Sequence, residues 1–294
     1  MKYIVFEAGS RAGFSAEKFF MNYLSLVPNT DDVLYLVDRD EDYCKIPTAD
    51  KRVIRMPEQE GLALLYGSEN TIRIFPADEL TRQNNPIAFR NAKDWGYSFV
   101  EKWYYNKKVL NHYLKEGYVF YDIHIPFTFE VEDVFIRPNT MSAGSKGVYG
   151  LENTCVTEKI DIQREYVVDV FKHKDTLNIY AREVKLRCGY DKMVKFLDDN
   201  HKLVKTLKQD LSKSDIPYLF DGVFHLQIAE DRNGVFFFIE ASKRISGTSI
   251  INLLNGYNPF CAVNGIELKP KHTVAKNTWY RYEDLLLKIA ENEK

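Results

Sequence analysis

The chain has 294 residues, of which 45% are hydrophobic and 28% charged, a composition typical of a globular protein with room for two domains. Its formal net charge of -2 gives no basic excess, so nucleic acid is not an expected partner. The four cysteines form no C-x-x-C pair, which argues against zinc or dithiol redox motifs and fits a reducing compartment. No signal peptide or apolar membrane span is evident, so we expect a cytoplasmic protein without membrane association.

Residues 1–85 alternate between short apolar runs and helix-forming segments. Strands are predicted at 3–6, 33–37 and 71–75, and from Val53 onward, with helices at 14–26 and 58–66. This alternation predicts a small parallel sheet with crossover helices, because parallel strands need long connections. Gly9, Ser10 and Arg11 follow the first strand, where ligands gather in open α/β sheets, and we expect a substrate there.

The second part of the chain has a different pattern of residues. The aromatic and basic residues at 88–116 have helical spacing, and β-branched and aromatic residues become frequent from about residue 118. Strands are predicted at 154–160, 165–171 and 176–186, and an amphipathic helix at 197–212 has Leu203, Val204, Leu207 and Leu211 on one face. Residues 222–229 and 235–240 alternate around an Asn-Gly turn, which predicts a hairpin. The fold class is therefore an N-terminal α/β domain joined to an α+β domain.

Residues 236–248, FFFIEASKRISGT, contain the sharpest candidate site. Side chains two residues apart share one strand face, so Glu240, Ser242 and Arg244 are expected to point the same way. A buried carboxylate there needs a cation, and Mg²⁺ is a natural candidate. Gln227, on the partner strand of the predicted hairpin, can lie beside Glu240 and add a second oxygen ligand. The alternative is a strand that emerges into solvent with an ordinary surface Glu–Arg pair.

A loop of small residues follows a predicted strand that ends in Arg137. Glycines let backbone N–H groups approach phosphates, and serine and lysine side chains add donors. The loop includes Ser142, Gly144, Ser145, Lys146 and Gly147. The Walker A pattern is absent, so a surface hairpin is the alternative.

Glu158 and Glu165 flank a short break between two predicted strands. They are either exposed acids at strand ends or parts of a hinge that meets an adenosine. In the second case one acid would lie near the adenine edge and the other would accept hydrogen bonds from the ribose hydroxyls.

The order of these segments resembles the ATP-grasp superfamily, and within it the ligases similar to the large subunit of carbamoyl-phosphate synthetase, over residues 100–282. The resemblance implies an ATP-grasp fold with a small N-terminal parallel-sheet (pre-ATP-grasp) domain. The implied domains are a pre-ATP-grasp domain at 1–100 and an ATP-grasp domain at 101–294. The second would contain a lid subdomain at 118–158 and a nucleotide- and metal-binding core at 159–294.

The resemblance also implies roles for individual residues. ATP would be bound by Lys107, Arg137, Ser142, Gly144, Ser145, Lys146, Gly147, Glu158, Lys159, Ile160 and Glu165. Mg²⁺ or Mn²⁺ would be bound by Gln227, Glu240 and Ser242, and the catalytic residues would be Arg244, Lys185 and Arg187. Ser242 departs from the family's usual Asn, which puts the second metal in doubt.

The implied function is an ATP-dependent carboxylate–amine ligase that works through an acyl phosphate and releases ADP and phosphate. Its partners would be a small-molecule carboxylate and amine, and the chain could form a homodimer. Two alternatives stay open, an ATP-grasp kinase that phosphorylates a small molecule and a degenerate nucleotide-binding regulatory protein.

Overall fold

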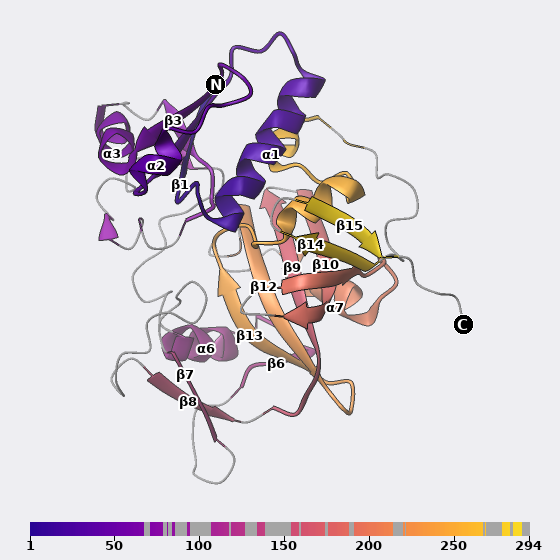
Figure 1. Cartoon of the computed structure of the whole chain (residues 1–294). Helices are drawn as coiled ribbons and strands as arrows, with labels where there is room; N and C mark the ends of the chain where they lie inside the picture. Colours follow the sequence, from indigo (N-terminus) through magenta and orange to yellow (C-terminus); the bar gives the residue numbers. More distant parts are fainter. Residues whose placement is uncertain are drawn as a thin grey trace. The chain divides into compact units, whose positions relative to one another are not determined.

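The structure is a computed structural model that describes residues 1–67, 71–78, 81, 84–85, 93–94, 107–117, 119–126, 134–138, 154–158, 160–173, 176–187, 191–213, 220, 222–266, 268, 278–282 and 285–289. The chain divides into two units (Figure 1). Unit 1 consists of Met1–Phe99 and Lys243–Val274, and unit 2 of Val100–Ser242 and Ala275–Lys294. None of the helices in the described part of the chain has the length and apolar character that a membrane span requires.

Unit 1 is built on a parallel sheet with the strand order β3-β2-β1-β4-β5. Its strands are β1 (Lys2–Phe6), β2 (Val33–Asp38), β3 (Val53–Pro57), β4 (Ile72–Ile74) and β5 (Lys93–Asp94). The connections contain the helices α1 (Arg11–Leu26), α2 (Glu41–Cys44) and α3 (Glu58–Gly67). The predicted parallel sheet with crossover helices is confirmed.

The two faces of this sheet are covered by different helices, because side chains alternate along β1. Ile4 and Phe6 pack with Leu65 of α3 in one cluster. Tyr3 packs edge-on against Phe20 of α1, and against Phe260 of the later helix α8 (Pro259–Val263). A segment more than two hundred residues away in sequence thus completes the core of unit 1.

The returning segment is held to α1 by polar contacts as well as by packing. It contains a 3₁₀ helix, η5 (Ser249–Asn255), just before α8. Asn258, which caps α8, donates from Nδ2 to the Phe19 carbonyl oxygen at 2.7 Å and to Asn22 Oδ1 at 2.9 Å. Asn258 is almost fully buried, so these bonds satisfy an amide that would otherwise be costly.

Unit 2 is built on an eight-stranded sheet with the order β15-β14-β11-β10-β9-β12-β13-β6. Its strands are β6 (Ile123–His124), β9 (Ile162–His173), β10 (Thr176–Arg187), β11 (Asp191–Phe196), β12 (Gly222–Asp231), β13 (Phe236–Ser242), β14 (Thr278–Tyr282) and β15 (Leu285–Ile289). Neighbours are antiparallel except β13 and β6, which are parallel. A separate antiparallel pair is formed by β7 (Val134–Pro138) and β8 (Thr154–Glu158).

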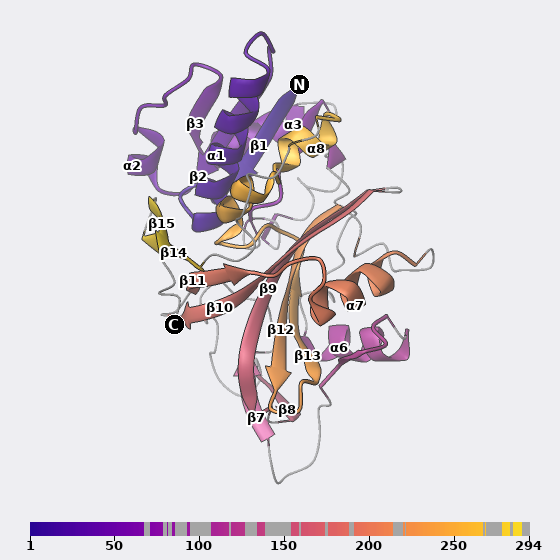
Figure 2. The ribbon, with the colours of Figure 1, turned by 90° about the vertical axis from the view of Figure 1, so that its right-hand side faces the viewer.

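One face of the eight-stranded sheet is covered by α6 (Lys107–Glu116) and α7 (Lys202–Leu211), as Figure 2 shows. The four apolar residues predicted for one face of α7 are all buried, so that prediction is confirmed. They pack with Leu110 and Leu114 of α6 and with the inward side chains of β9, β12 and β13.

Two predicted helices differ from the described structure. Within 88–116 only Lys107–Glu116 is a described helix, and Lys93–Asp94 forms a strand that pairs with β4. The helix predicted at 197–212 begins at Lys202, after a turn that follows β11. Strand pairing at 93–94 and the turn after β11 account for these differences. The sequence of one segment does not show which other strand it will pair with.

Candidate functional site

Three neighbouring strands of unit 2 bring predicted site residues onto one face. Gln227 of β12 lies directly opposite Glu240 of β13. On the other side of β12, Glu165 of β9 lies opposite Ala229, two residues beyond Gln227. Directly opposed residues share a face and alternate residues return to it, so Glu165, Gln227 and Glu240 all lie on one face. All three are half-buried.

This face is the one that α6 and α7 leave uncovered. Leu226 and Ile228, which flank Gln227, belong to the cluster under the two helices. Gln227 must therefore point to the opposite face, and Glu165 and Glu240 with it. We call the set Glu165, Gln227 and Glu240 the carboxylate face.

A β-bulge lies at the pair Gln227–Glu240. Gln227 is opposite Glu240, but the next residue, Ile228, is opposite Phe238, so Ile239 is the extra residue of β13. A bulge re-aims the side chains beside it and is often found near functional sites. Here it brings Glu240 opposite Gln227 while Phe238 stays fully buried in the core.

The turn of this hairpin fits its sequence. Asp231 accepts hydrogen bonds from the backbone N–H groups of Asn233 at 2.8 Å and Val235 at 2.9 Å. Gly234 has a φ of 75°, a backbone conformation that residues with a side chain rarely adopt. The predicted hairpin is confirmed: its turn sets the register from Glu230–Phe236 to Ile228–Phe238, and the bulge then shifts it by one residue so that Gln227 lies opposite Glu240.

A buried polar row continues along the same face, one step from the carboxylate face. His225 lies opposite Ser242 on β13 and opposite Asp169 on β9. Asp169 forms an ion pair with Arg182 of β10, with 2.7 Å between Oδ2 and Nη2. At most 2% of each of these four residues is exposed. Of this row only Ser242 was predicted from the sequence as a site residue, although Asp169 and Arg182 are charged residues within largely apolar strands.

The donors of the carboxylate face fit a hard cation. An amide oxygen and a carboxylate are both oxygen ligands, and Mg²⁺ is usually bound in proteins by one or two such groups, with phosphate oxygens and water as the others. Gln227 and Glu240 can supply two ligands, while Ser242 is fully buried opposite His225. Among the described residues no three His, Cys, Asp or Glu side chains form a cluster that could hold a metal ion.

The other predicted catalytic residues are placed as follows. Lys185 forms an ion pair with Glu183 at 2.6 Å, and Glu183 lies opposite Tyr166, which belongs to the core under the helices. Lys185 therefore lies away from the carboxylate face. Arg244 belongs to unit 1, is half-buried, and donates from Nη1 to the carbonyl oxygen of Ile245 at 3.0 Å.

For several predicted nucleotide ligands, and for the predicted catalytic residue Arg187, the structure describes only the backbone. Lys107 begins α6, Arg137 lies in β7, and Glu158 and Arg187 end β8 and β10. Ile160 is half-buried, and its carbonyl oxygen accepts from the N–H of Ile162 at 3.0 Å. Ser142, Gly144, Ser145, Lys146, Gly147 and Lys159 lie outside the described residues.

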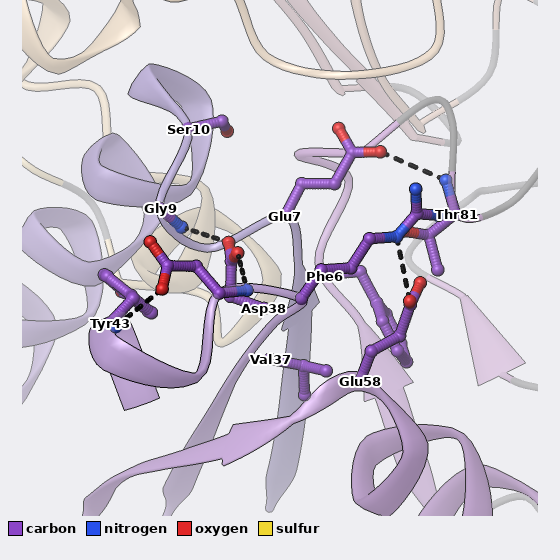
Figure 3. A pocket seen from close by; sticks show the side chains of 11 residues that line it. Phe6, Glu7, Gly9, Ser10, Val37, Asp38, Tyr43, Glu58 and Thr81 are labelled. Atoms are coloured by element: carbon purple, nitrogen blue, oxygen red, sulfur yellow. Dashed lines mark hydrogen bonds and ion pairs between the residues drawn. The ribbon is translucent and has the colours of Figure 1, made fainter. Parts of the chain in front are cut away.

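Unit 1 contains a pocket of its own, with a volume of about 380 Å³ (Figure 3). It lies at the carboxyl ends of β1 and β2 and is lined by Gly9 and Ser10, together with residues that follow β2. Ser10 caps α1, and its hydroxyl accepts from the N–H of Gly13 at 3.1 Å. The position expected for a substrate from the sequence is thus part of a pocket.

Comparison with known proteins finds similarity in structure and none in sequence. No family model matches the chain, and no curated protein matches its sequence. N5-carboxyaminoimidazole synthetase from Staphylococcus aureus, complexed with ADP, has a TM-score of 0.66 and 12% identity, covering 95% of this chain and 81% of that one. A protein from Archaeoglobus fulgidus assigned to the ATP-grasp superfamily has a TM-score of 0.65 and 14% identity, covering 99% of this chain and 96% of that one.

A third similar structure holds both a nucleotide and a metal. It is the biotin carboxylase domain of 2-oxoglutarate carboxylase from Hydrogenobacter thermophilus, in complex with MgADP, ADP and bicarbonate. Its TM-score is 0.67 at 10% identity, covering 95% of this chain and 74% of that one. At such identities the similarity establishes the fold. The chain therefore has the ATP-grasp fold, with the small N-terminal parallel sheet that the resemblance implied.

Proposed function

We propose that this chain is an ATP-dependent carboxylate–amine ligase. In the first step a carboxylate oxygen of the substrate attacks the γ-phosphorus of ATP, the bond to ADP breaks, and an acyl phosphate forms. In the second step an amine nitrogen attacks the acyl carbon and phosphate leaves, while the nitrogen loses one proton. The products are an amide, ADP and phosphate.

The observation that carries this proposal is the carboxylate face, where Glu165, Gln227 and Glu240 lie on the side of one sheet that α6 and α7 do not cover. Two of the similar structures hold ADP, one of them with magnesium and bicarbonate. We infer that the carboxylate face has the corresponding use in this chain, since its oxygen donors suit a nucleotide and its cation.

Each residue of the face has a proposed role. Gln227 and Glu240 would hold Mg²⁺ or Mn²⁺, which when bound would offset negative charge on the phosphate oxygens. Glu165 would accept hydrogen bonds from the ribose hydroxyls. Phosphoryl transfer depends mainly on positioning and electrostatics, so the protein needs no nucleophile of its own.

Several positively charged residues and one loop also have proposed roles. Lys107, Arg137 and Arg244 would bind phosphate oxygens, and the loop from Ser142 to Gly147 would cover the phosphates and exclude water. Exclusion of water matters because an acyl phosphate hydrolyses readily. A direct role for Lys185 would require its ion pair with Glu183 to open.

The experiment that tests this function is Glu240→Gln, assayed by ADP release with pooled amino acids and small carboxylic acids. The substitution is nearly isosteric and removes one negative charge, so the fold and nucleotide binding should survive. Turnover should fall by a factor on the order of 10²–10³, which is typical for the loss of one electrostatic element. The control is Glu116→Gln on the exposed side of α6, which should behave as wild type.

The assay also separates the alternatives. Near wild-type turnover by folded Glu240→Gln would show that Glu240 does not hold the cation. A phosphorylated product with no amide would show a kinase. Tight ATP binding without ADP release across the whole pool would show a nucleotide-binding protein without ligase activity.

A further inference from the structure

The carboxylate face carries little negative charge where a cation would bind. Gln227 is neutral, and Glu240 directly opposite it is the one carboxylate of the pair. Glu165 lies on the far side of β12, opposite Ala229, and its proposed partner is the ribose. Mg²⁺ is usually bound by one or two carboxylates besides phosphate oxygens, and two such ions about 3.5–4 Å apart repel each other strongly. A single carboxylate therefore suits a single ion.

Apolar side chains border the Gln227–Glu240 pair on two sides. Along the hairpin, the next pair on the same face is Ala229 and Phe237. Across the sheet, Val167 of β9 lies opposite Gln227. None of these three side chains has an oxygen atom, so none can bind Mg²⁺. A second cation on this part of the sheet could take a further ligand only from the remaining side, which is the buried polar row.

The buried polar row has no room for a hydrated ion. Ser242, on the same face as Glu240, has no exposed surface, and His225 opposite it is 2% exposed. Mg²⁺ gives up its water reluctantly and usually keeps several water molecules when it binds to a protein. Glu240, by contrast, is half-buried, so an ion with part of its water shell can reach it.

The charges of the row also disfavour a second cation. Its one carboxylate belongs to Asp169, whose Oδ2 lies 2.7 Å from Nη2 of Arg182, and neither side chain is exposed. The guanidinium cancels the charge of the carboxylate, so this pair has no net charge. His225, next in the row, adds no negative charge, since an imidazole is either neutral or positive. A divalent ion moved from Glu240 towards Ser242 would therefore approach an arginine without gaining a negative ligand.

We propose that the carboxylate face binds one divalent cation, held by Gln227 and Glu240, and that the buried polar row keeps a second one out. This inference rests on the proposed function, because it takes the cation to accompany a nucleotide. Ser242, which the resemblance implied as a further metal ligand, would then bind no metal. The buried ion pair would neutralise the row beside the cation, and basic side chains would offset the remaining negative charge of the phosphates.

The test counts the ions bound to the full chain with Mn²⁺ and adenylyl imidodiphosphate, an ATP analogue that resists hydrolysis. Electron paramagnetic resonance measures the free Mn²⁺ and hence the number of ions bound per chain. It also shows whether two bound ions lie close together, because neighbouring Mn²⁺ ions split each other's signals. We expect one tightly bound ion per chain with the spectrum of an isolated ion. A second ion coupled to the first, or no bound ion, would overturn the proposal.

Variants show which side chains hold the ion. Glu240→Gln should weaken Mn²⁺ binding at least about tenfold, since the one charged ligand is lost, whereas Glu116→Gln, an exposed acid of α6, should bind as wild type. Unchanged Mn²⁺ affinity in folded Glu240→Gln would overturn the proposal.

Ser242→Cys tests whether the residue that follows Glu240 on this face binds metal. The substitution is nearly isosteric and replaces a hard oxygen with a soft sulfur, which favours Zn²⁺ over Mn²⁺. The preference between these ions should stay within about twofold of the wild type. Ser242→Ala, with the same limit on the Mn²⁺ affinity, replaces it if the cysteine variant does not fold. A clear shift towards Zn²⁺, or a loss of Mn²⁺ binding in folded Ser242→Ala, would make Ser242 a ligand and overturn the proposal.

The two proposals can fail independently. If two coupled ions bind while Glu240→Gln abolishes ADP release, the inference of a single cation alone is wrong. If one ion binds at Glu240 while the wild type releases no ADP with any acceptor, the proposed ligase function alone is wrong.

Discussion

Asp169 and Arg182 form an ion pair of 2.7 Å between the adjacent strands β9 and β10, and neither side chain is exposed. Asp169 lies opposite His225, which in turn lies opposite Ser242. The ion pair therefore stands at one end of a buried polar row that crosses to β13, next to the carboxylate face. A charge in such a place is tolerated only when its partner is present.

Arg182→Met should destabilise the protein strongly because it removes the guanidinium that pairs with the buried Asp169 carboxylate. The expected loss in the free energy of unfolding is about 3–5 kcal/mol, measured by urea denaturation. The double variant Asp169→Leu with Arg182→Met should recover much of this loss, since an apolar pair of similar volume needs no counter-charge.

The exposed ion pair between Arg232 and Asp161 is a matched control. Its distance is also 2.7 Å, but its side chains are 71% and 62% exposed. Arg232→Met should cost at most about 1 kcal/mol. If the two single variants lose equal stability, burial does not determine the value of the Asp169–Arg182 pair.

Glu165→Ala should weaken ATP binding without unfolding the chain. Glu165 is half-buried on the face of β9 that α6 and α7 do not cover, and the proposed bond from its carboxylate to the ribose is worth about 1.5–3 kcal/mol. Affinity measured by calorimetry should fall by a factor of about 10–150. Asp161→Ala, an exposed acid just before β9, should leave the affinity unchanged. Equal affinities for wild type and Glu165→Ala would make Glu165 an ordinary strand-end acid.

Gly13→Ala should destabilise unit 1, although alanine is the better helix former. A Cβ at Gly13 would lie 2.4 Å from Ala8 Cα and 2.5 Å from its carbonyl oxygen, so the first turn of α1 would have to move. Overpacking of this kind costs on the order of 1–3 kcal/mol.

Gly67→Ala is the matched control for Gly13→Ala. Gly67 ends α3, and no described atom lies within 4 Å of a Cβ built there. The substitution should be neutral or stabilising by up to about 1 kcal/mol. Denaturation curves of the two variants should therefore shift in opposite directions or differ clearly in size, and an equal shift would contradict the steric argument.

Asp50 should contribute to acid sensitivity. Hydrogen bonds from the Arg52 side chain and from its backbone N–H lower the pKa of the Asp50 carboxyl to about 2. A lowered pKa in the folded state means that the stabilisation is present above the ordinary value of 3.8 and is lost as pH falls towards 2.

Asp50→Asn should remove this part of the pH dependence. At neutral pH the variant should be less stable by at most about 1 kcal/mol, since the pair lies near the surface. Below pH 2, where the Asp50 carboxyl is protonated in both the folded and the unfolded state, the difference should vanish. The measurement is the free energy of unfolding of both proteins across this range, and a difference that stays constant with pH would contradict the assignment.

The local pattern of apolar and turn residues was sufficient to predict much of the fold. The apolar runs at 3–6 and 33–37, with an amphipathic helix between them, predicted parallel strands because that connection returns the chain to the same end of the sheet. The Asn-Gly turn at 233–234 predicted the hairpin, since glycine adopts the required φ. In these cases the relevant interactions lie within a few residues of one another.

The candidate sites depended on tertiary structure to different degrees. Glu240 and Gln227 could be linked from the sequence because one tight turn makes their strands neighbours, although the bulge that sets them directly opposite was not predicted. Asp169 and Arg182 could not, because charged residues in a sequence look exposed until packing buries them together. The residues that line the unit 1 pocket follow separate elements, and only the parallel order of β1 and β2 brings them to one end of the sheet.

The sequence by itself determined β1 to β4, α1 and α3 of the parallel sheet, the hairpin and the resemblance to the ATP-grasp superfamily, because these depend on short-range periodicity and turn chemistry. It did not predict α2 or β5. Only the tertiary structure decided that β11 ends before α7, that Lys243–Val274 belongs with unit 1, and that His225 lies between Asp169 and Ser242. Those outcomes depend on which distant segments pair. Which segments pair depends on the burial of entire faces of helices and sheets, because the side chains of several elements must pack together at the same time.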